Sequence, residues 1–456
     1  MSATPPTRDA ARTTHPKSGM PTSDTIEIKE ITRVEGHGNL SVRIADGEIT
    51  RLELQIVESP RFFESFVRGK RFDDVPQIVC RICGICSVAH TSAAVKAIEA
   101  AAGIVPSEQT ILLRKLILFG EQIQSHVLHL YFLAVPDYLG VGSVIPLAKT
   151  HPEVVKRALR MKKLANDLCA VIGGRHIHPI SYRVGGFSHL PAPSELQDIK
   201  ARLESARSDL DETVKLFEAL SIPDYRRDTE YLALQAADAN EYAFYDGRLV
   251  SSMDASPTEP KDYRRRVIES VVAHSTAKHS RSPLSESYAV GALARFNINA
   301  DRLHPVARQA AKRLGLQRPC SSPFHNNTAQ LVETIHCVES AIELADRLLS
   351  EGTAAEPIAG PKNFGRGVGI VEAPRGVLIH EYDLDEKGRV RDANLIIPTN
   401  QNLANIEADL RGLVPPMLAQ QATRDEITGR LEMLVRAYDP CISCATHFLD
   451  IDWVES

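Results

Sequence analysis

The sequence has no apolar run near the roughly 20 residues that a membrane-spanning helix needs, so no such helix is predicted. Its first residues, MSATPPTRDAARTTHPKSGMPTSD, lack the apolar centre of a secretory signal, and their Pro, Ser and Thr content predicts a disordered tail over residues 1–24. The net charge of -5 leaves no excess of positive charge for nucleic-acid binding. These absences predict a cytoplasmic protein without a nucleic-acid partner.

Internal repeats, long linkers and a GxGxxG strand–turn–helix unit are also missing. The chain is therefore not predicted to bind a dinucleotide itself. Hydrophobic residues make up 43% of the sequence, which is enough for a large buried core. One domain over residues 25–447 is predicted in place of separable modules, and residues 448–456 form a C-terminal extension.

Alternating apolar and polar residues predict two small antiparallel sheets. The first covers 25–57 with Asp46-Gly47 as its turn, and the second covers 368–397 with Lys387-Gly388 as its turn. Elsewhere apolar residues recur at helical spacing. The predicted helices cover about 28 residues after Ser107, then 152–173, 194–219, 262–278, 302–315, 326–351 and 415–436. The sequence thus predicts a mainly α (α+β) fold with a large central helical bundle and peripheral antiparallel sheets.

Five of the 8 cysteines lie in two short clusters, CRICGIC and DPCISC. In a chain without an export signal, such clusters indicate metal or redox chemistry and not disulfides. Cys83 with Cys86, and Cys441 with Cys444, form two Cys-x-x-Cys pairs, and four thiolates select zinc, iron–sulfur clusters or nickel. The remaining cysteines are predicted to be core residues: Cys80, Cys169, Cys320 and Cys337.

Each cysteine pair is followed by a histidine. If the pairs lie on helices, His90 and His447 fall on the same narrow arc as the preceding thiolates, either as ligands or as donors to sulfur. A structural zinc site is the alternative, although such sites usually take their ligands from one compact module. Spacing alone leaves zinc and a redox metal equally open.

Two longer motifs carry a specific resemblance. RICGICSVAH at 81–90 and DPCISCATH at 439–447 match RxCGxCxxxH and DPCxxCxxH, the paired signature of nickel–iron hydrogenase large subunits. Further segments similar to that family follow in order: RVEGHG at 33–38, RFFE at 61–64, GGRHIHP at 173–179, EAPRG at 372–376 and IPTNQN at 397–402. The chain therefore resembles the catalytic subunit of a nickel–iron hydrogenase, which implies that family's fold and the reversible heterolytic cleavage of H2.

The resemblance implies how the metals are held. All four paired cysteines would bind nickel, and Cys86 and Cys444 would also bridge to an iron that carries CO and two cyanides. Cys83 and Cys441 would be terminal ligands of nickel. The match to RVEGHG implies that Glu35 accepts the proton from Cys441, which requires hydrogen-bond reach between the two side chains.

The resemblance also implies roles for residues around the metals. Arg375 would place its guanidinium over them as a catalytic group, and Asp439 would hold it there. Thr399 would donate a hydrogen bond to a cyanide, and His90 would donate to a bridging sulfur. Many membrane-bound relatives have an acidic residue in the long helix where Ser125 stands here, so the charge above the metals differs.

Two further assignments follow from the same resemblance. Glu64 and His447 would be ligands of a structural Mg2+, a hard cation that prefers oxygen ligands and water. His178 would face the nearest iron–sulfur cluster of a partner protein.

No cysteine cluster remains for an iron–sulfur chain, so electrons must leave through another protein. The resemblance implies an iron–sulfur small subunit, and residues 61–90 most resemble cytoplasmic NADP-linked or sulfhydrogenase enzymes. Those enzymes also have flavin and NAD(P)-binding diaphorase and electron-transfer subunits. Maturation chaperones and a peptidase that removes residues 448–456 once nickel is in place are implied as well.

Three alternatives stay open. A quinone-site component of respiratory complex I shares the fold, but such components lack the paired cysteines. A non-catalytic four-cysteine scaffold would contain zinc alone, which metal analysis distinguishes from nickel with iron. A hydrogenase linked to a heterodisulfide or deazaflavin partner would differ in its neighbouring subunits.

Overall fold

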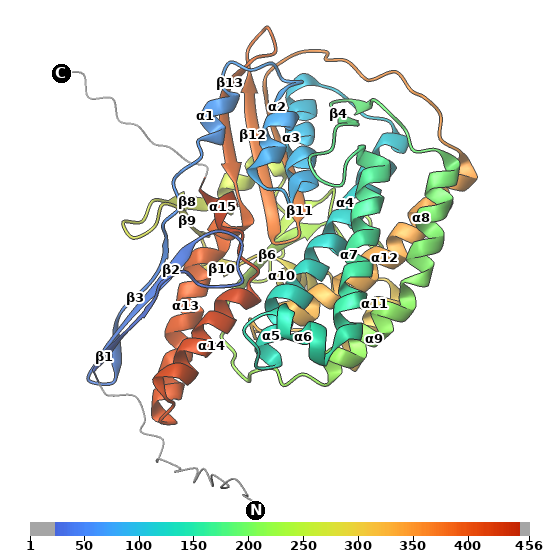
Figure 1. Cartoon of the computed structure of the whole chain (residues 1–456). Coiled ribbons are helices and arrows are strands. Elements are labelled where there is room, and N and C mark those ends of the chain that lie inside the picture. The colour runs from blue at the N-terminus through green and yellow to red at the C-terminus, as the bar shows by residue number, and fades with distance from the viewer. Residues whose placement is uncertain (1–22, 447–456) are drawn as a thin grey trace, which may run out of the picture.

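The computed structural model describes residues 23–446. A bundle of long helices occupies one side of the molecule, and the sheets and the C-terminal helices occupy the other side (Figure 1). The bundle helices are α4 (Glu108–Leu128), α7 (Pro152–Gly173), α8 (Pro193–Ser205), α9 (Arg207–Glu218), α11 (Pro305–Arg313) and α12 (His325–Glu351). The predicted mainly α (α+β) architecture, with a helical bundle and small antiparallel sheets, is confirmed.

Helix α4 lies at the centre of the bundle, between α7 and α12. It begins as its sequence predicts, because the Ser107 side chain accepts a hydrogen bond from the Thr110 N–H at 3.1 Å. After Leu128 the helix widens into a π-helical segment, η2 (His129–Ala134), and continues as α5 (Val135–Tyr138). The shorter helices elsewhere are α1 (Phe63–Val67), α2 (Val75–Val79), α6 (Val144–Thr150), α10 (Ala292–Asn299) and the 3-10 turn η4 (Ala300–Arg302).

Both predicted sheets are present, and each has three antiparallel strands. The first contains β1 (Asp24–Ile28), β2 (Gly38–Ala45) and β3 (Glu48–Ile56), and the second contains β11 (Arg366–Ala373), β12 (Gly376–Leu384) and β13 (Val390–Ile396). The smaller sheets contain β6 (Glu230–Gln235), β7 (Arg248–Ser251) and β10 (Tyr288–Ala289), the pair β4 (Tyr182–Arg183) and β5 (Gly186–Phe187), and the pair β8 (Ile268–Ser270) and β9 (His279–Arg281).

Helix α3 (Ser87–Ala102) lies directly on strand β11. A Cβ atom on Gly367 or Gly369 would come within 2.2 Å of the Ala97 or Ala93 carbonyl oxygen, so only glycine allows this approach. The close packing fixes the start of α3 relative to the turn between β11 and β12. Cys86 precedes that start and Arg375 lies in that turn, so the contact positions both side chains.

Three helix predictions are wrong in whole or in part. Residues 262–278 form no α-helix, because the segment begins inside the short 3-10 helix η3 (Pro260–Arg265) and then contains β8, which pairs with β9. Its β-branched residues favour the strand, and this pairing prevails over helical spacing. The predicted helix 194–219 is two helices, α8 and α9. The predicted helix 415–436 is the end of α13 (Pro398–Ala419) followed by α14 (Arg424–Ala437).

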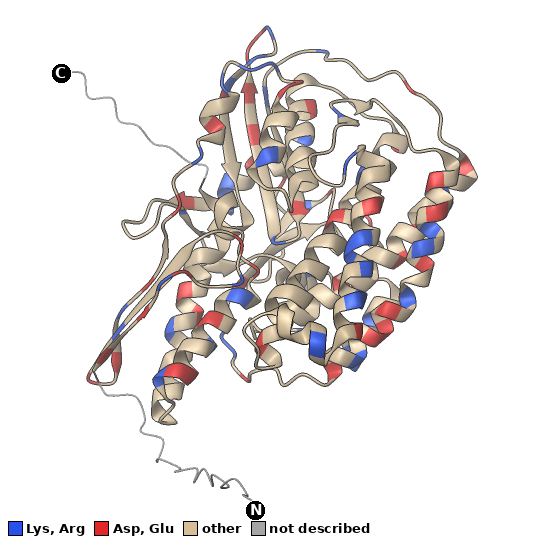
Figure 2. Cartoon of the chain, in the orientation of Figure 1, with Lys and Arg blue, Asp and Glu red and all other residues tan. Residues whose placement is uncertain are grey.

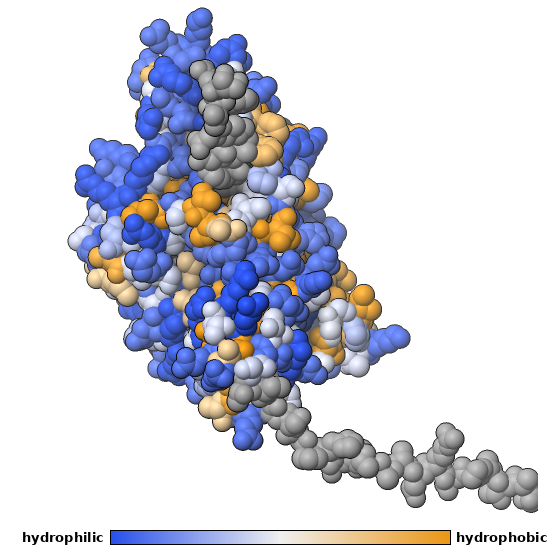
Figure 3. Space-filling model, turned by 90° about the vertical axis from the view of Figure 1, so that its left-hand side faces the viewer, coloured by the Kyte–Doolittle hydropathy of each residue, from blue (hydrophilic) through white to orange (hydrophobic). Residues whose placement is uncertain are grey.

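The surface of the outer helices carries both signs of charge, interspersed along α7 and α8 (Figure 2). On the face in Figure 3, hydrophobic residues form small separate groups among hydrophilic ones. Among residues 23–446, no helix is both long and apolar enough to cross a bilayer.

Candidate metal centre

The two cysteine pairs meet in the folded chain. Cys83, Cys86, Cys441 and Cys444 are buried, and their four sulfur atoms all lie within 4.8 Å of one another. The first pair follows the 3-10 turn η1 (Cys80–Ile82), and the second pair begins just before the short helix α15 (Ile442–Ala445). Four thiolates in one buried cluster form a donor set for a soft metal.

The first cysteine of each pair lies outside a helix, so the expected helical arc is wrong. Cys83 is extended, with φ -149° and ψ 137°, and helix α3 begins only after Cys86. Cys441 likewise precedes α15 with φ -106° and ψ 90°. The extended conformation leaves the Ile85 N–H free to donate to the Cys83 sulfur at 3.3 Å, a bond that a continuing helix would not allow.

The sulfurs are matched across the two pairs. Cys83 Sγ lies 3.6 Å from Cys441 Sγ, and Cys86 Sγ lies 3.6 Å from Cys444 Sγ. Within the second pair, the Cys441 and Cys444 sulfurs are joined as a disulfide, 2.50 Å apart, which the cysteine spacing did not predict; as metal ligands both would be reduced thiolates. A hydrogen bond with Cys86 lowers the pKa of Cys83 to about 7, and the charge of Arg375 acts in the same direction. The first residues of the pairs thus face each other, and so do the second residues.

Glu35 lies beside the second pair. Its Oε2 lies 3.1 Å from the Cys441 sulfur and accepts a hydrogen bond from the Ser443 N–H at 3.0 Å, and its carbonyl accepts from the Ile442 N–H at 2.8 Å. Gly36 makes this approach possible, because it has φ +85° and an added Cβ would lie 2.7 Å from Ile442 Cβ. The carboxylate is therefore held at proton-transfer distance from one sulfur.

Arg61 joins the two cysteine segments, a role that the sequence did not reveal. One guanidinium nitrogen, Nη2, donates to the Ile82 carbonyl at 2.7 Å and also to the Ser443 carbonyl. Each carbonyl directly precedes a cysteine. The cationic side chain thus fixes the spacing between the two halves of the cluster.

Arg375 and Asp439 form a buried ion pair above the sulfurs. Arg375 donates through Nε to the Asp439 carbonyl at 2.7 Å and through Nη2 to Asp439 Oδ1 at 2.8 Å. Burial lowers the pKa of Arg375, but the charges of Asp439 and the nearby thiolates outweigh burial and raise it. Its Nη1 is buried without a hydrogen-bond partner in the described part of the chain. An orphaned donor beside the four-cysteine cluster indicates that a bound group with an acceptor atom belongs there.

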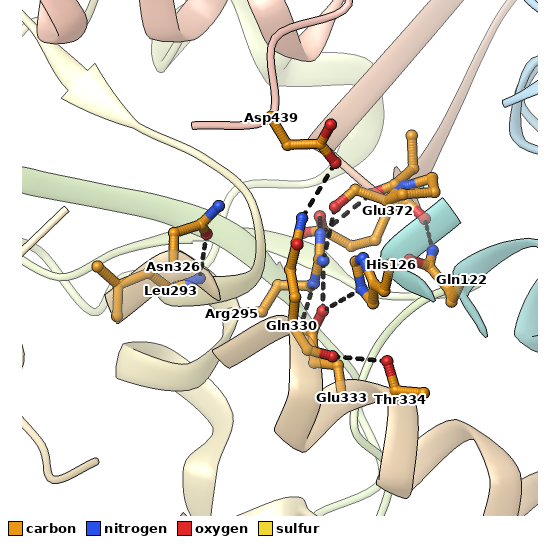
Figure 4. A network of polar contacts seen from close by, with 12 residues as sticks. Gln122, His126, Leu293, Arg295, Asn326, Gln330, Glu333, Thr334, Glu372 and Asp439 are labelled. Carbon is orange, nitrogen blue, oxygen red and sulfur yellow. Dashed lines mark hydrogen bonds and ion pairs between the residues drawn. The ribbon is translucent and has the colours of Figure 1, made fainter. Parts of the chain in front are cut away.

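A second buried network of polar side chains is joined to Asp439 of this ion pair through Gln330 (Figure 4). Gln330 on α12 donates to Asp439 Oδ2 at 3.1 Å. On the same helix, Glu333 pairs with Arg295 at 2.6 Å, and Arg295 also pairs with Glu372 at 2.9 Å. Burial raises the pKa of Glu333, but Arg295 outweighs burial and holds it near 2, whereas burial raises the pKa of Glu372 to about 7. One guanidinium thus pairs with two carboxyl groups, but it outweighs the effect of burial on the pKa only at Glu333.

Thr399 contacts the second cysteine pair, and His90 follows the first pair along α3. The Thr399 hydroxyl oxygen accepts the Cys441 N–H at 3.0 Å, so its own proton can point elsewhere. His90 lies one turn after Cys86 along α3, and its backbone N–H donates to the Cys86 carbonyl at 3.1 Å. Its Nδ1 lies 3.1 Å from His380 Nε2. Both side chains are almost completely buried.

Helix α4 supplies a carboxylate that sequence reasoning missed. Glu121 is fully buried and accepts the backbone N–H groups of Val88 at 2.5 Å and Ala89 at 2.8 Å. These are the first-turn donors of α3, which has no side-chain cap of its own. Burial raises the pKa of Glu121 to about 8. One turn later, the buried Ser125 hydroxyl has no partner among the residues that the structure describes.

The remaining predicted site residues make other contacts or lie outside the described residues. Glu64 Oε1 accepts the Leu395 N–H at 2.8 Å, and His447 lies outside the described residues. His178 is half-buried at a positive φ of 53°, where its Nδ1 lies 3.1 Å from the Cys80 carbonyl. Cys80 is buried, and it is absent from the four-sulfur cluster. Cys169 and Cys337 are also buried and Cys320 is partly buried.

Comparison with known families finds one whose description is nickel-dependent hydrogenase, matched over residues 61–157 and 235–447. The chain is 36% identical to the alpha chain of sulfhydrogenase 1 from Pyrococcus furiosus, over 92% of this chain and 97% of that protein. It is 31% identical to an F420-non-reducing hydrogenase component of Methanothermobacter thermautotrophicus, over 93% of this chain and 95% of that protein.

Solved structures give the same result for the fold. An NAD+-reducing [NiFe]-hydrogenase in the H2-reduced state superposes with a TM-score of 0.85 at 29% identity, over 94% of this chain and 100% of the other. An H2-activated [NiFeSe]-hydrogenase from Dm. baculatum has a TM-score of 0.73 at 22% identity, over 93% of this chain and 100% of the other, and supports the fold alone.

Proposed function

The chain belongs to the nickel-dependent hydrogenase family as a catalytic large subunit, and on this premise we propose that its four-cysteine cluster holds a nickel–iron centre. The observation that carries the proposal is the meeting of four buried sulfurs, from two segments at opposite ends of the described chain, within 4.8 Å. When bound, the centre would supply the site at which H2 is split heterolytically. The activity would be the reversible oxidation of H2 to protons and electrons.

The donor set and its surroundings fit such a centre. Cys83 and Cys441 face each other, which suits terminal ligands of nickel, and Cys86 and Cys444 face each other, which suits bridges to iron. The iron would carry CO and two cyanides, and Arg375 Nη1, which has no partner among the described residues, would donate to one such ligand. Thr399, with its proton free of the Cys441 contact, would donate to a second cyanide.

Glu35 is proposed as the acid–base group. The Cys441 sulfur would hold the proton released from H2, and Glu35 Oε2, 3.1 Å away, would take it from there. The backbone N–H of Ser443 stabilises the carboxylate in the orientation that reaches the sulfur. Arg375, fixed by Asp439, would keep a positive charge over the thiolates and so favour their ionised forms. His90 would orient the Cys86 sulfur from α3.

A magnesium ion is proposed beside the second cysteine pair. Glu64 would supply one carboxylate oxygen, and His447, just beyond the described residues, would be the second ligand. Glu64 is held by the Leu395 N–H at 2.8 Å, which fixes its carboxylate near β13. Removal of Mg2+ by a chelator, followed by elemental analysis of wild-type protein and Glu64→Gln, tests this assignment.

Electrons are proposed to leave through an iron–sulfur small subunit, which His178 would face from its half-buried position on the surface. The likeness to an NAD+-reducing hydrogenase supports further diaphorase and electron-transfer subunits that deliver the electrons to NAD(P) in the cytoplasm. In a second candidate, the acceptor is a heterodisulfide or a deazaflavin; the relative named as F420-non-reducing favours the heterodisulfide of these two, because F420 is itself a deazaflavin. H2-driven reduction assays with NAD+, NADP+, a heterodisulfide and a deazaflavin distinguish the candidates.

Maturation is proposed to involve chaperones that deliver the metals and a peptidase that removes residues 448–456 after nickel insertion. Mass spectrometry of active protein tests this step. A mass that ends at His447 supports processing, whereas a mass that includes Ser456 contradicts it.

Infrared spectroscopy of the purified complex, combined with metal analysis, tests the proposed centre itself. Bands from metal-bound CO and cyanide, together with one nickel for each chain, are the expected result. Zinc in place of nickel and no such bands would instead indicate a four-cysteine zinc scaffold. Cys441→Ser should abolish H2 turnover, and unchanged turnover in that variant would contradict the proposal.

A further inference from the structure

A second group of metal-ligand side chains lies outside the cysteine cluster, where the β8–β9 hairpin meets helix α13. It consists of His274 in the hairpin loop, His279 at the start of β9 and Glu407 on α13. One ring nitrogen of each histidine and one carboxylate oxygen of Glu407 all lie within 4.8 Å of one another. Two segments far apart in the sequence thus bring two imidazoles and a carboxylate to one point.

The contacts within the group leave room for a cation. His274 Nε2 lies 2.9 Å from Glu407 Oε1, and the same oxygen accepts the Leu54 N–H at 2.8 Å. Both hydrogen bonds end on Oε1, so Oε2 is the oxygen that can face a bound ion. The two imidazole planes are nearly perpendicular, at 87°, with ring centroids 5.4 Å apart, so the rings do not stack against each other.

His279 provides the independent observation that a ligand is missing. Its side chain is buried, with 7% exposure, and its Nε2 has no hydrogen-bond partner among residues 23–446. A buried polar atom without a partner costs free energy, so core histidines normally have both ring nitrogens satisfied. A cation between His279 and its two neighbours would supply the missing interaction.

We propose that His274, His279 and Glu407 bind a divalent transition-metal cation of the zinc class. Two imidazole nitrogens and one carboxylate match the three protein ligands of many zinc sites, whereas Mg2+ and Ca2+ prefer oxygen ligands. The side chains of His274 and Glu407 are 21% and 13% exposed, so a water molecule can reach the fourth coordination position. The ion would join the β8–β9 hairpin to α13, and through Glu407 to Leu54 on β3.

Zinc titration of the nickel-loaded complex tests this proposal. Nickel content is measured in every sample, so that zinc uptake by vacant cysteine sites is recognised and excluded. Wild-type protein should bind one zinc for each chain beyond its nickel. His274→Ala, His279→Ala and Glu407→Gln should each weaken zinc binding at least about 100-fold, since loss of even an outer partner of a metal ligand typically costs 10- to 100-fold.

His304→Ala is the matched control, because His304 Nε2 lies 3.4 Å from Glu343 in a histidine–glutamate pair that belongs to no three-ligand group in the described chain. This variant should bind zinc as the wild type does. If His279→Ala does not fold, the more exposed His274→Ala gives the decisive comparison. Failure of the wild type to bind the extra zinc, or equal binding by all variants, would overturn the proposal.

Discussion

Substitution of Glu35 by glutamine removes the proposed proton acceptor and preserves the size of the side chain. Glu35 Oε2 lies 3.1 Å from the Cys441 sulfur, within the range for direct proton transfer. A carboxamide cannot take up that proton. Because a positioned acid–base group contributes roughly 100- to 10,000-fold to a rate, turnover should fall by a factor in that range. Glu35→Asp, which keeps the carboxyl group on a shorter chain, should retain more activity than Glu35→Gln.

The assay must separate lost proton transfer from a lost metal centre. H2 oxidation with an artificial electron acceptor and H2–D2O isotope exchange are measured together with nickel content and the infrared bands. Exchange and turnover should fall in parallel while nickel and the bands stay at wild-type values. If Glu35→Gln keeps more than half of wild-type turnover with a full complement of nickel, the assignment of Glu35 is refuted.

Three further predictions concern the surroundings of the cluster. Arg375→Lys should lower turnover about tenfold or more while nickel is retained, because lysine cannot make both contacts to Asp439, and steady-state kinetics with metal analysis checks this. Gly36→Ala should lower both the nickel content and the unfolding temperature. The alanine Cβ would lie 2.7 Å from Ile442 Cβ at a backbone position of positive φ, and the clash would shift Glu35. Unchanged values in both measurements would contradict this prediction. In the folded protein the pKa of Glu372 is raised to about 7, so this carboxyl group loses its proton at lower pH in the unfolded chain than in the folded one. The free energy of unfolding should therefore fall as pH rises from about 4.5 to 7. Glu372→Gln should show a smaller fall than the wild type over that range, as measured by chemical denaturation.

Local patterns were sufficient to predict several parts of this molecule. The alternation over 25–57 and the Asp46-Gly47 turn predicted β1 to β3, and Ser107 predicted the start of α4. The cysteine spacing predicted a metal site, and the resemblance predicted that Glu35 belongs beside Cys441. In each of these cases, the signal is contained in a few neighbouring residues or in motifs of fixed spacing.

Other features depend on contacts between distant segments and have no local signal. Arg61 was noted only as part of the RFFE segment, and its bonds to the Ile82 and Ser443 carbonyls appear only in the folded chain. Glu121 was not singled out at all, although it caps a different helix. The strand at 268–270 exists because residues 279–281 pair with it, so its own helical spacing misled the prediction.

The separation of 358 positions between Cys83 and Cys441 has a consequence for synthesis of the protein. A nascent polypeptide that has emerged only as far as α12 contains Cys83 and Cys86 but neither Cys441 nor Cys444. The complete ligand set exists only after the last described residues, up to Thr446, have left the ribosome and reached Glu35 and Arg61. If the proposed centre forms here, its metals would therefore be loaded after translation of nearly the whole chain, and truncated products would be unable to retain it.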